Sequence, residues 1–308
     1  MATKITKNCT AAIIGRPNAG KSTLINTLVG EKIAIVTPKP QTTRTTILGV
    51  VNTDDTQFVF TDTPGYHKPR TKLGGNMVQA VGSAISGTDC CVLVVPPEPN
   101  VGRQEQALLA RVAAGKIPCI LAINKVDTIA KEEIFAIIGE YMRYAEEIGF
   151  TFVTIVPISA KRADGTAELL DEVAHFAQDG GELFTDGVIT NQTDTQIICE
   201  IIREKLLFAL EREIPHGIAV ELERFSERDA ASGEPVIDID AVIYCEKQSH
   251  KGIVIGKNGE VLRKIGQYAR EDIEKYMGTK VSLHTFVKVR ENWRDSPGWI
   301  KNLGLNAE

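Results

Sequence analysis

The sequence has 308 residues, 43% hydrophobic and 24% charged, with a formal net charge of −5. This length suits two domains, and the composition is ordinary for a soluble globular protein. No run of about 18 apolar residues argues for a membrane-spanning helix, and the six cysteines form no C-x-x-C pair, which favours a reducing cytoplasm over a disulfide or metal framework.

The first half of the chain alternates apolar strands with amphipathic helices. We expect strands at residues 10–15, 57–65, 90–96, 119–125 and 152–160, and helices between them such as 20–30 and 103–116. Strands that are apolar almost throughout are typical of a parallel sheet buried on both faces. The pattern predicts a doubly wound α/β domain over residues 1–178.

The first motif is "GRPNAGKS", which follows the first expected strand and opens a helix. It matches the P-loop pattern G-x-x-x-x-G-K-[ST], in which backbone N–H groups wrap phosphates at a helix N-terminus. Lys21 can reach the β- and γ-phosphates, and the Ser22 hydroxyl can bind Mg²⁺. The residues expected to contact nucleotide here are Gly15, Arg16, Pro17, Asn18, Ala19, Gly20, Lys21, Ser22 and Thr23.

The next segment, "PKPQTTRTT", lies between the P-loop helix and the following strand. A threonine in this place can bind Mg²⁺ only while the γ-phosphate is present, which would make the segment a switch. We select Thr43 for this role, with Thr42 as the second candidate. Thr45 and Thr46 are better explained as the edge of a strand.

The motif "DTPG" ends the next apolar strand. Asp62 can hold the water shell of Mg²⁺, and the N–H of Gly65 can sense the γ-phosphate, with Thr63 and Pro64 between them. Ras-like enzymes carry a water-orienting glutamine directly after this glycine, whereas this chain carries Tyr66. Slow intrinsic hydrolysis is the hypothesis that follows.

Two later motifs identify the base. Asp127 of "NKVD" can accept hydrogen bonds from the N1–H and the exocyclic amine of guanine, which adenine does not offer in that arrangement. Ala160 of "SAK" can donate its N–H to the guanine carbonyl. The residues expected at this subsite are Asn124, Lys125, Asp127, Ser159, Ala160 and Lys161. The motif order predicts a GTP site.

A glycine-rich polar segment at residues 179–195 is the expected linker, and a second domain is expected over 196–308. Its pattern is a helix, two strands, a helix, a G-x-x-G loop, a helix and a strand, which is an α+β module. From Asp240 onward the chain carries twelve Lys/Arg against nine Asp/Glu, a modest indication of a polyanionic partner. Trp293 and Trp299 in the tail are expected to cap the core rather than stack on bases.

The G-x-x-G loop runs from Gly256 to Gly259, and glycine there would let a nucleic-acid backbone approach helix N-termini. Lys251 and Lys257 would add a salt-dependent attraction. A plain turn between helices is the alternative for this short motif. The residues expected to contact RNA are Lys251, Ile255, Gly256, Lys257, Asn258 and Gly259.

The segments "GRPNAGKSTLIN", "PKPQTTR", "DTPGYHKP", "NKVD" and "ISAK", together with the G-x-x-G module, resemble the bacterial Era family of GTPases over nearly the whole chain. The resemblance implies a P-loop G domain followed by a type II KH domain that binds single-stranded RNA. It also implies a GTPase switch that binds the 16S ribosomal RNA near its 3′ end and assists assembly of the 30S subunit.

The resemblance carries further expectations about the site. Lys21, Thr43, Gly65 and Asn18 would serve hydrolysis, and Mg²⁺ would be held by Ser22, Thr43 and, through water, Asp62. Relatives with an asparagine at the place of Asn18 are stimulated by K⁺, which implies a K⁺ beside the phosphates. A monomer in the cytoplasm is implied. The alternative is a signalling GTPase at the inner face of the membrane whose C-terminal domain binds a protein or lipid.

Overall fold

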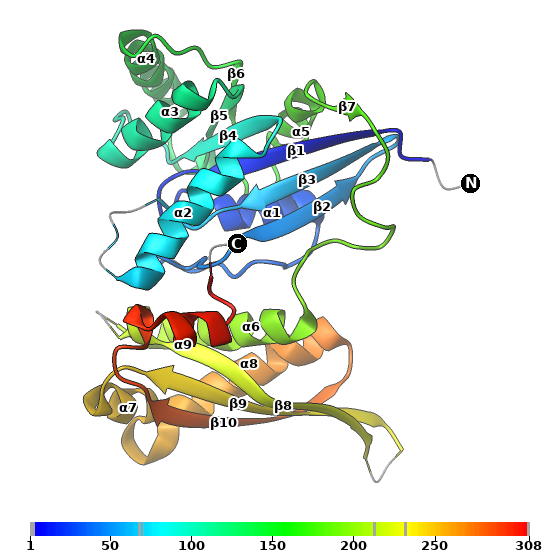
Figure 1. Ribbon diagram of the computed structural model, residues 1–308, viewed down its shortest axis with the longest axis vertical. Helices are drawn as coiled ribbons and strands as arrows, with labels where there is room; N and C mark the ends of the chain where they lie inside the picture. The colour runs from blue at the N-terminus through cyan, green and yellow to red at the C-terminus, as the bar shows by residue number, and fades with distance from the viewer. Residues whose placement is uncertain (1–3, 67–68, 70, 212–213, 231–232, 307–308) are drawn as a thin grey trace. The chain divides into compact units, whose positions relative to one another are not determined.

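The computed structural model describes residues 4–66, 69, 71–211, 214–230 and 233–306. The chain divides into two compact units, and the main boundary between them falls between Asn191 and Gln192; residues 71–73 are also assigned to the second unit. This boundary lies inside the segment 179–195 that the sequence predicts as a linker. Each unit has its own sheet and its own core (Figure 1).

The first unit is built on one twisted sheet with the order β2-β3-β1-β4-β5-β6 (Figure 1). Neighbouring strands are parallel except β2, which runs antiparallel to β3, and a short β7 that pairs antiparallel with β1. The strands are β1 (Lys7–Ile14), β2 (Ile47–Asn52), β3 (Thr56–Asp62), β4 (Cys90–Val95), β5 (Cys119–Ile123), β6 (Thr154–Pro157) and β7 (Gln178–Asp179).

Helices cover both faces of this sheet. They are α1 (Lys21–Val29), α2 (Lys72–Ser86), α3 (Arg103–Gly115), α4 (Lys131–Glu147) and α5 (Thr166–Ala174). Side chains of β1 alternate between two cores: Ala11 and Ile13 pack with α1 and α5, whereas Ala12 and Ile14 pack with α2, α3 and α4. Burial on both faces is why these strands are apolar throughout. The doubly wound α/β prediction is confirmed.

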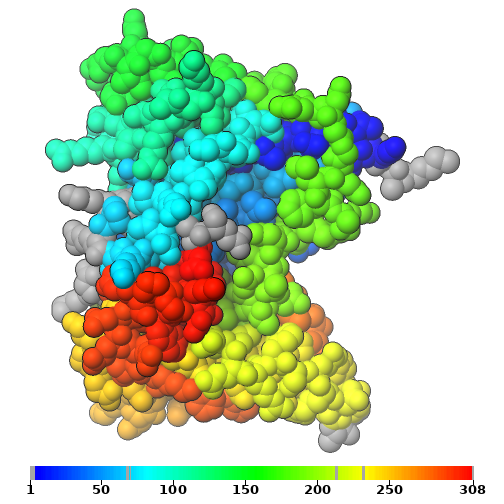
Figure 2. All heavy atoms as spheres, in the orientation of Figure 1, coloured from blue at the N-terminus to red at the C-terminus, as the bar shows by residue number. Residues whose placement is uncertain are grey.

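The segment that follows β7 packs on its own unit. The buried side chain of Gln57 accepts hydrogen bonds from the N–H groups of Leu183 (2.7 Å) and Phe184 (2.8 Å), and Val50 N donates to Ile189 O (2.9 Å). In Figure 2 this green segment lies against the blue strands of the first unit. Glycines and polar residues mark the segment as irregular, but the sequence pattern gives no sign of these long-range partners.

The second unit has the element order predicted for the KH module. It comprises α6 (Asp194–Ala209), β8 (Ala219–Asp229), β9 (Pro235–Cys245), α7 (Gln248–Ile255), α8 (Glu260–Met277) and β10 (Lys280–Val289), followed by α9 (Pro297–Asn302). β9 lies between an antiparallel β8 and a parallel β10. The odd-numbered residues of β9 face the core formed with α6 and α8.

The tail is held by its tryptophans. Trp293 is fully buried and its indole N–H donates to Gly217 O (2.9 Å), while the ring of Trp299 packs edge-on against Tyr244 and beneath Arg290. Trp293 therefore caps the core, as expected. Among the residues that the structure describes, no helix is both long and apolar enough to cross a bilayer.

Candidate functional site

The P-loop connects β1 to α1, and its backbone explains the glycines. Gly20 has φ 102° and is the N-cap residue of α1, and a Cβ there would lie 2.1 Å from Asn124 Nδ2. A Cβ on Gly15 would lie 2.3 Å from the carbonyl oxygen of Val94. No side chain fits at either position, so the loop runs close to the ends of β4 and β5. The N-terminus of α1 faces the same place and favours an anion.

Lys21 is buried at the start of α1. Its Nζ donates to the carbonyl oxygens of Gly15 (3.1 Å) and Arg16 (3.2 Å). Burial lowers the pKa of Lys21, while the charge of Asp62 opposes this shift. The same burial raises the pKa of Asp62, which the charge of Lys21 opposes. The site therefore holds two opposite charges away from water, a costly arrangement that is characteristic of functional sites.

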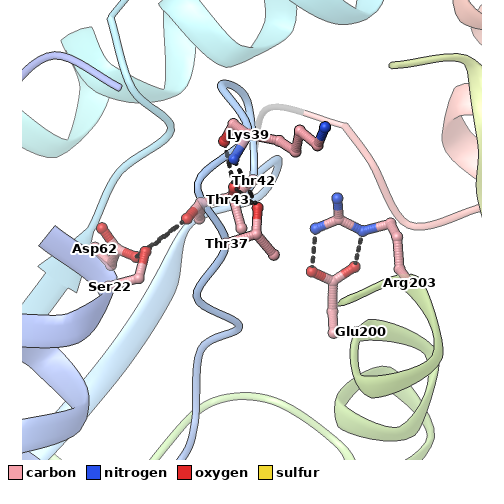
Figure 3. A network of polar contacts seen from close by, with 8 residues as sticks. All are labelled: Ser22, Thr37, Lys39, Thr42, Thr43, Asp62, Glu200 and Arg203. Carbon is pink, nitrogen blue, oxygen red and sulfur yellow. Dashed lines mark hydrogen bonds and ion pairs between the residues drawn. The ribbon is translucent and has the colours of Figure 1, made fainter. Parts of the chain in front are cut away.

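Three side-chain oxygens from three separate segments meet where Ser22, Thr43 and Asp62 come together (Figure 3). Ser22 Oγ donates to Asp62 Oδ2 (2.7 Å) and lies 2.9 Å from Thr43 Oγ1, and Thr43 Oγ1 lies 3.3 Å from Asp62 Oδ2. The second oxygen of Asp62 is buried and has no hydrogen-bond partner within the described part of the chain. Two hydroxyls and a carboxylate are hard oxygen donors, so this set fits Mg²⁺.

Thr42 points elsewhere. Its hydroxyl lies 2.8 Å from Thr37 Oγ1 and donates to Lys39 O (2.7 Å), which closes a small turn of residues 37–42 (Figure 3). Lys39 N donates to Thr37 Oγ1 as well (3.2 Å). The geometry favours Thr43 over Thr42 as the metal ligand. The Glu200–Arg203 ion pair in the same view is internal to α6.

The expected base subsite lies at the ends of β5 and β6. Asn124 Nδ2 donates to Ala19 O (2.9 Å), and Asn124 Oδ1 accepts from the backbone N–H groups of Lys125 (2.8 Å) and Ala160 (3.0 Å). Lys125 Nζ donates to Asn18 O (2.7 Å). These bonds tie both base-recognition motifs to the P-loop.

Asp127 is oriented by the second motif. Ser159 Oγ donates to Asp127 Oδ1 (2.8 Å), and Arg162 Nε lies 3.3 Å from the other oxygen. The hydrogen bond from Ser159 lowers the pKa of Asp127, and the charge of Arg162 adds to this. The carboxylate is therefore ionised and can accept from guanine. Lys161, also predicted here, is exposed and beside this pair in sequence.

Several of the predicted residues line one pocket, whereas the side chains of Thr63 and Arg16 contact other parts of the chain. The pocket is lined by the predicted residues Pro17, Asn18, Gly20, Lys21, Ser22, Thr23, Thr42, Thr43 and Gly65, and also by Ile35, Val36, Thr37 and Gln41, which the sequence analysis missed. Thr63 Oγ1 instead donates to Ile13 O (3.0 Å), and the side chain of Arg16 makes an ion pair with Glu98. Pro64 is buried next to Gly65.

One missed residue fixes the stretch that leads into the switch segment of residues 38–46. Asn26 Nδ2 donates to Ala34 O (2.7 Å), and Asn26 Oδ1 accepts from the N–H groups of Ile33 (3.0 Å) and Ala34 (2.9 Å). An asparagine inside a helix pattern is a weak helix former, which is the one signal that could have singled it out. Asn18 reaches the same segment, since its Nδ2 donates to Pro38 O (2.8 Å).

The G-x-x-G loop is different in character. Gly256 (φ 73°) and Gly259 (φ 77°) flank a short turn in which Asn258 also has positive φ (51°). Lys257 and Asn258 are exposed, whereas Ile255 and Lys251 in α7 are partly covered. Only α8 begins at this loop, because α7 ends there, so the expectation of helix N-termini holds for one helix. Four aliphatic residues lie around the loop in sequence, Ile253, Val254, Ile255 and Ile265; of these, Val254 and Ile265 belong to the core.

Comparison with known proteins gives the same two parts. A family model described as 50S ribosome-binding GTPase matches residues 10–125, and a KH-domain model matches residues 213–294. The chain is 45% identical over 296 residues to GTPase Era of Clostridioides difficile (strain 630), covering 96% of this chain and 97% of that protein. GTPase Era of Ruminiclostridium cellulolyticum is 43% identical over 296 residues, with 96% of each chain covered.

Solved structures agree over the whole length. A crystal structure of Era in complex with MgGDPNP and nucleotides 1506–1542 of 16S ribosomal RNA matches with a TM-score of 0.91 at 31% identity, over 98% of this chain and 99% of that one. A variant of Aquifex aeolicus Era bound to GDP·AlF4⁻ matches with a TM-score of 0.90 at 30% identity, over 97% and 99%.

Proposed function

Because the chain belongs to the Era family of GTPases, we propose that it binds 16S ribosomal RNA near its 3′ end through the second unit and assists assembly of the 30S subunit. It is a GTPase that uses GTP and Mg²⁺, as the motifs predict. The nucleotide state would act as the switch for RNA binding.

One observation carries the RNA part of this proposal. The Era structure that matches both units of the chain holds a segment of 16S ribosomal RNA together with MgGDPNP. The description of the wider G-domain family names the 50S subunit, but that model matches only residues 10–125 and leaves the KH unit out. We give more weight to the relative that matches the whole chain, and its RNA belongs to the small subunit.

The geometry of the nucleotide site supports the following roles for its residues. The P-loop N–H groups and Lys21 would hold the β- and γ-phosphates, and Gly65 N–H would meet the γ-phosphate. Gly65 packs closely on the P-loop, because a Cβ there would lie 2.9 Å from Pro17 N. Mg²⁺ would be held by Ser22 and Thr43, with Asp62 behind a water; when bound, it neutralises charge on the phosphates.

The predicted K⁺ would lie where Asn18 meets the switch segment. Asn18 Nδ2 donates to the carbonyl oxygen of Pro38, so a cation there would replace this hydrogen bond and would need the carboxamide turned to present Oδ1 beside Pro38 O. Oxygen ligands of these two kinds suit a monovalent cation, and its charge would stabilise the transition state. Tyr66 in place of a glutamine supports slow intrinsic hydrolysis.

The RNA contact would be made by the exposed loop. Gly256 and Gly259 let the phosphate backbone approach, and Lys257, Asn258 and the nearby Lys251 and Ile255 would surround it. With a ribosomal partner, the location we propose is the cytoplasm, and the state we propose is a monomer. Peripheral contact with the inner face of the membrane is the alternative that the RNA experiment must answer.

The test is fluorescence anisotropy with a short single-stranded RNA that copies the 3′ end of 16S ribosomal RNA, at fixed salt, with non-hydrolysable GTP and with GDP. The variant Lys257→Asp/Asn258→Asp places negative charge in the loop. A matched control is Lys301→Asp/Asn302→Asp, which changes the same two residue types at exposed positions of α9.

We expect tighter binding in the GTP form, loss of binding in the loop variant, and little change in the control. Equal affinity in both nucleotide states would mean that the nucleotide transmits nothing to the RNA site. No sequence-selective binding in either state would overturn the RNA assignment and move the membrane alternative forward, to be checked by sedimentation with anionic vesicles.

A further inference from the structure

The nucleotide site described above leaves one buried charge unexplained. Glu105, in the first turn of α3, is 1% exposed, and neither of its carboxylate oxygens has a hydrogen-bond partner among the described residues. An ionised carboxylate buried without a partner is costly. Its ion-pair partner is Arg16, whose Nε lies 3.4 Å from Glu105 Oε1.

Arg16 belongs to the P-loop, but its side chain turns away from the pocket. Its Nη2 donates to Glu98 Oε2 (2.6 Å) in the connection from β4 to α3, and its Nε faces Glu105. The two acidic partners differ, because the Glu98 side chain is 57% exposed and Glu105 is buried. Exposed ion pairs are worth little, so the buried partner is the one that can fix the position of Arg16.

The main chain of Arg16, unlike its side chain, is hydrogen-bonded to Lys21 of the nucleotide site. Arg16 O accepts from Lys21 Nζ (3.2 Å) and from Ala19 N (3.3 Å), and the neighbouring Gly15 O accepts from Lys21 Nζ (3.1 Å) and from Tyr66 N (3.4 Å). Lys21 therefore holds the P-loop through main-chain oxygens on the pocket side, and the ion pair between Arg16 and Glu105 holds it on the side away from the pocket.

We propose that Glu105 is a positioning residue for GTP: through Arg16 it fixes the P-loop in the orientation that receives the β- and γ-phosphates. This inference rests on the proposed nucleotide site. Glu105 touches neither substrate nor metal in this scheme and acts through the loop alone. Because the phosphate contacts exist in the ground state and in the transition state alike, loosening the loop raises KM more than it lowers kcat.

Glu105 also lies at the N-terminus of α3, where a negative charge favours the helix. A Cβ on Gly102 would lie 2.7 Å from Glu105 Oε2, so the side chain folds back over the helix start. If this were its only role, removing the charge would change the melting temperature but not the affinity of the folded protein for phosphates. The two roles therefore differ in their readout.

The experiment compares wild type, Glu105→Gln and Glu140→Gln by displacement of a fluorescent guanine nucleotide with GDP and with GMP. Glu140 is the control, because it forms a surface ion pair with Arg143 in α4 that lies outside the nucleotide site. We expect Glu105→Gln to bind GDP about tenfold more weakly. GMP, which lacks the β-phosphate, should bind as it does to wild type, and Glu140→Gln should match wild type for both.

Unchanged GDP affinity in Glu105→Gln overturns the inference, and so does a proportional loss for GDP and GMP. Wild type that fails to bind GDP would overturn the proposed nucleotide site itself, so the two failures are distinguishable. If Glu105→Gln does not fold, Arg16→Lys carries the test, since one ammonium group cannot make both contacts. It should lower GDP affinity selectively, and an unchanged GDP-to-GMP ratio would count against the inference.

Discussion

The two loops to which we assign function differ in how they are held. The P-loop region contains buried polar side chains that are hydrogen-bonded within the site: Lys21, Asp62, Asn124 and Ser159 are each at most 5% exposed. At the G-x-x-G loop, Lys257 and Asn258 are exposed and the shape comes from positive φ angles. A buried polar network must be satisfied in one arrangement, whereas an exposed loop needs only a permitted backbone. Single substitutions should therefore cause large losses of function in the P-loop region and small losses at the G-x-x-G loop.

The largest effect is expected at the base subsite. Asp127→Asn replaces two acceptor oxygens by an amide that cannot accept both bonds from guanine, and GTP affinity should fall about a thousandfold. Xanthine carries a carbonyl where guanine carries its amine, so XTP should bind the variant better than GTP does. The measurement is nucleotide competition with both.

The control for this substitution is Asp164→Asn, which lies in the loop after β6 and is exposed. It should leave GTP affinity unchanged. If Asp127→Asn bound GTP as tightly as wild type, the carboxylate would not recognise the base, and the contrast between a sharp and a weak site would fail at its strongest point.

The next effect separates two adjacent threonines. Thr43→Val removes a hydroxyl that lies 2.9 Å from Ser22 Oγ in the oxygen cluster, and we expect kcat to fall about a hundredfold at saturating Mg²⁺. Thr42→Val removes a hydroxyl that closes the turn of residues 37–42 and is not one of the three clustered oxygens of Ser22, Thr43 and Asp62, so it should change kcat little. Single-turnover GTP hydrolysis measures both. Equal losses, or a larger loss for Thr42, would contradict the geometry.

These two regions also differ in how well the sequence predicts them. The P-loop, Asp62, Asn124 and Ser159 stand at the carboxyl ends of apolar strands, and parallel strands bring such ends together. The order of the motifs was therefore enough to predict that these residues lie together at one edge of the sheet. The choice between Thr42 and Thr43 was open, because their difference depends on a turn closed by Thr37 and Lys39, which no periodicity reveals.

The residues whose roles could not be predicted from the sequence act through partners that lie outside their own motif or helix. Glu105 reads as an ordinary acidic residue in the first turn of a helix, and only the fold brings it to Arg16. Asn26 and Gln57 likewise accept hydrogen bonds from backbone groups that belong to none of the quoted motifs. In the second unit the order of elements was predictable from hydrophobic pattern and turns. The sequence did not show which aliphatic residues near the G-x-x-G loop belong to the core, because all of them share the same chemistry.

At the exposed loop we expect a smaller, graded effect. Lys257→Ala removes one charge near the RNA backbone, so the slope of log K against log salt should fall in magnitude by about 0.7. Lys301→Ala, an exposed lysine in α9, should leave the slope unchanged. Anisotropy titrations with the 16S-derived RNA at several salt concentrations measure this. Loss of all binding on removing this single charge would contradict the view that the loop is loosely determined.

The smallest effect brings the same contrast inside the second unit, where Asp238 is a buried charge within β9. Its carboxylate accepts from Arg228 Nε (2.7 Å) and Arg224 Nη2 (3.1 Å), and the hydrogen bond from Arg228 lowers the pKa of Asp238. A lowered folded-state pKa means that the ion pairs stabilise above the ordinary aspartate value near 4 and lose that contribution as pH falls through the folded pKa. Asp238→Asn should therefore lower the melting temperature by about 2 °C at pH 7, and the difference should shrink below about pH 4.

Both tryptophans of the chain lie in this unit, so their fluorescence follows its unfolding. Asp229→Asn, an exposed aspartate at the end of β8, should show no such pH dependence. A difference for Asp238→Asn that persisted unchanged to pH 3 would mean that its ion pairs do not hold the sheet.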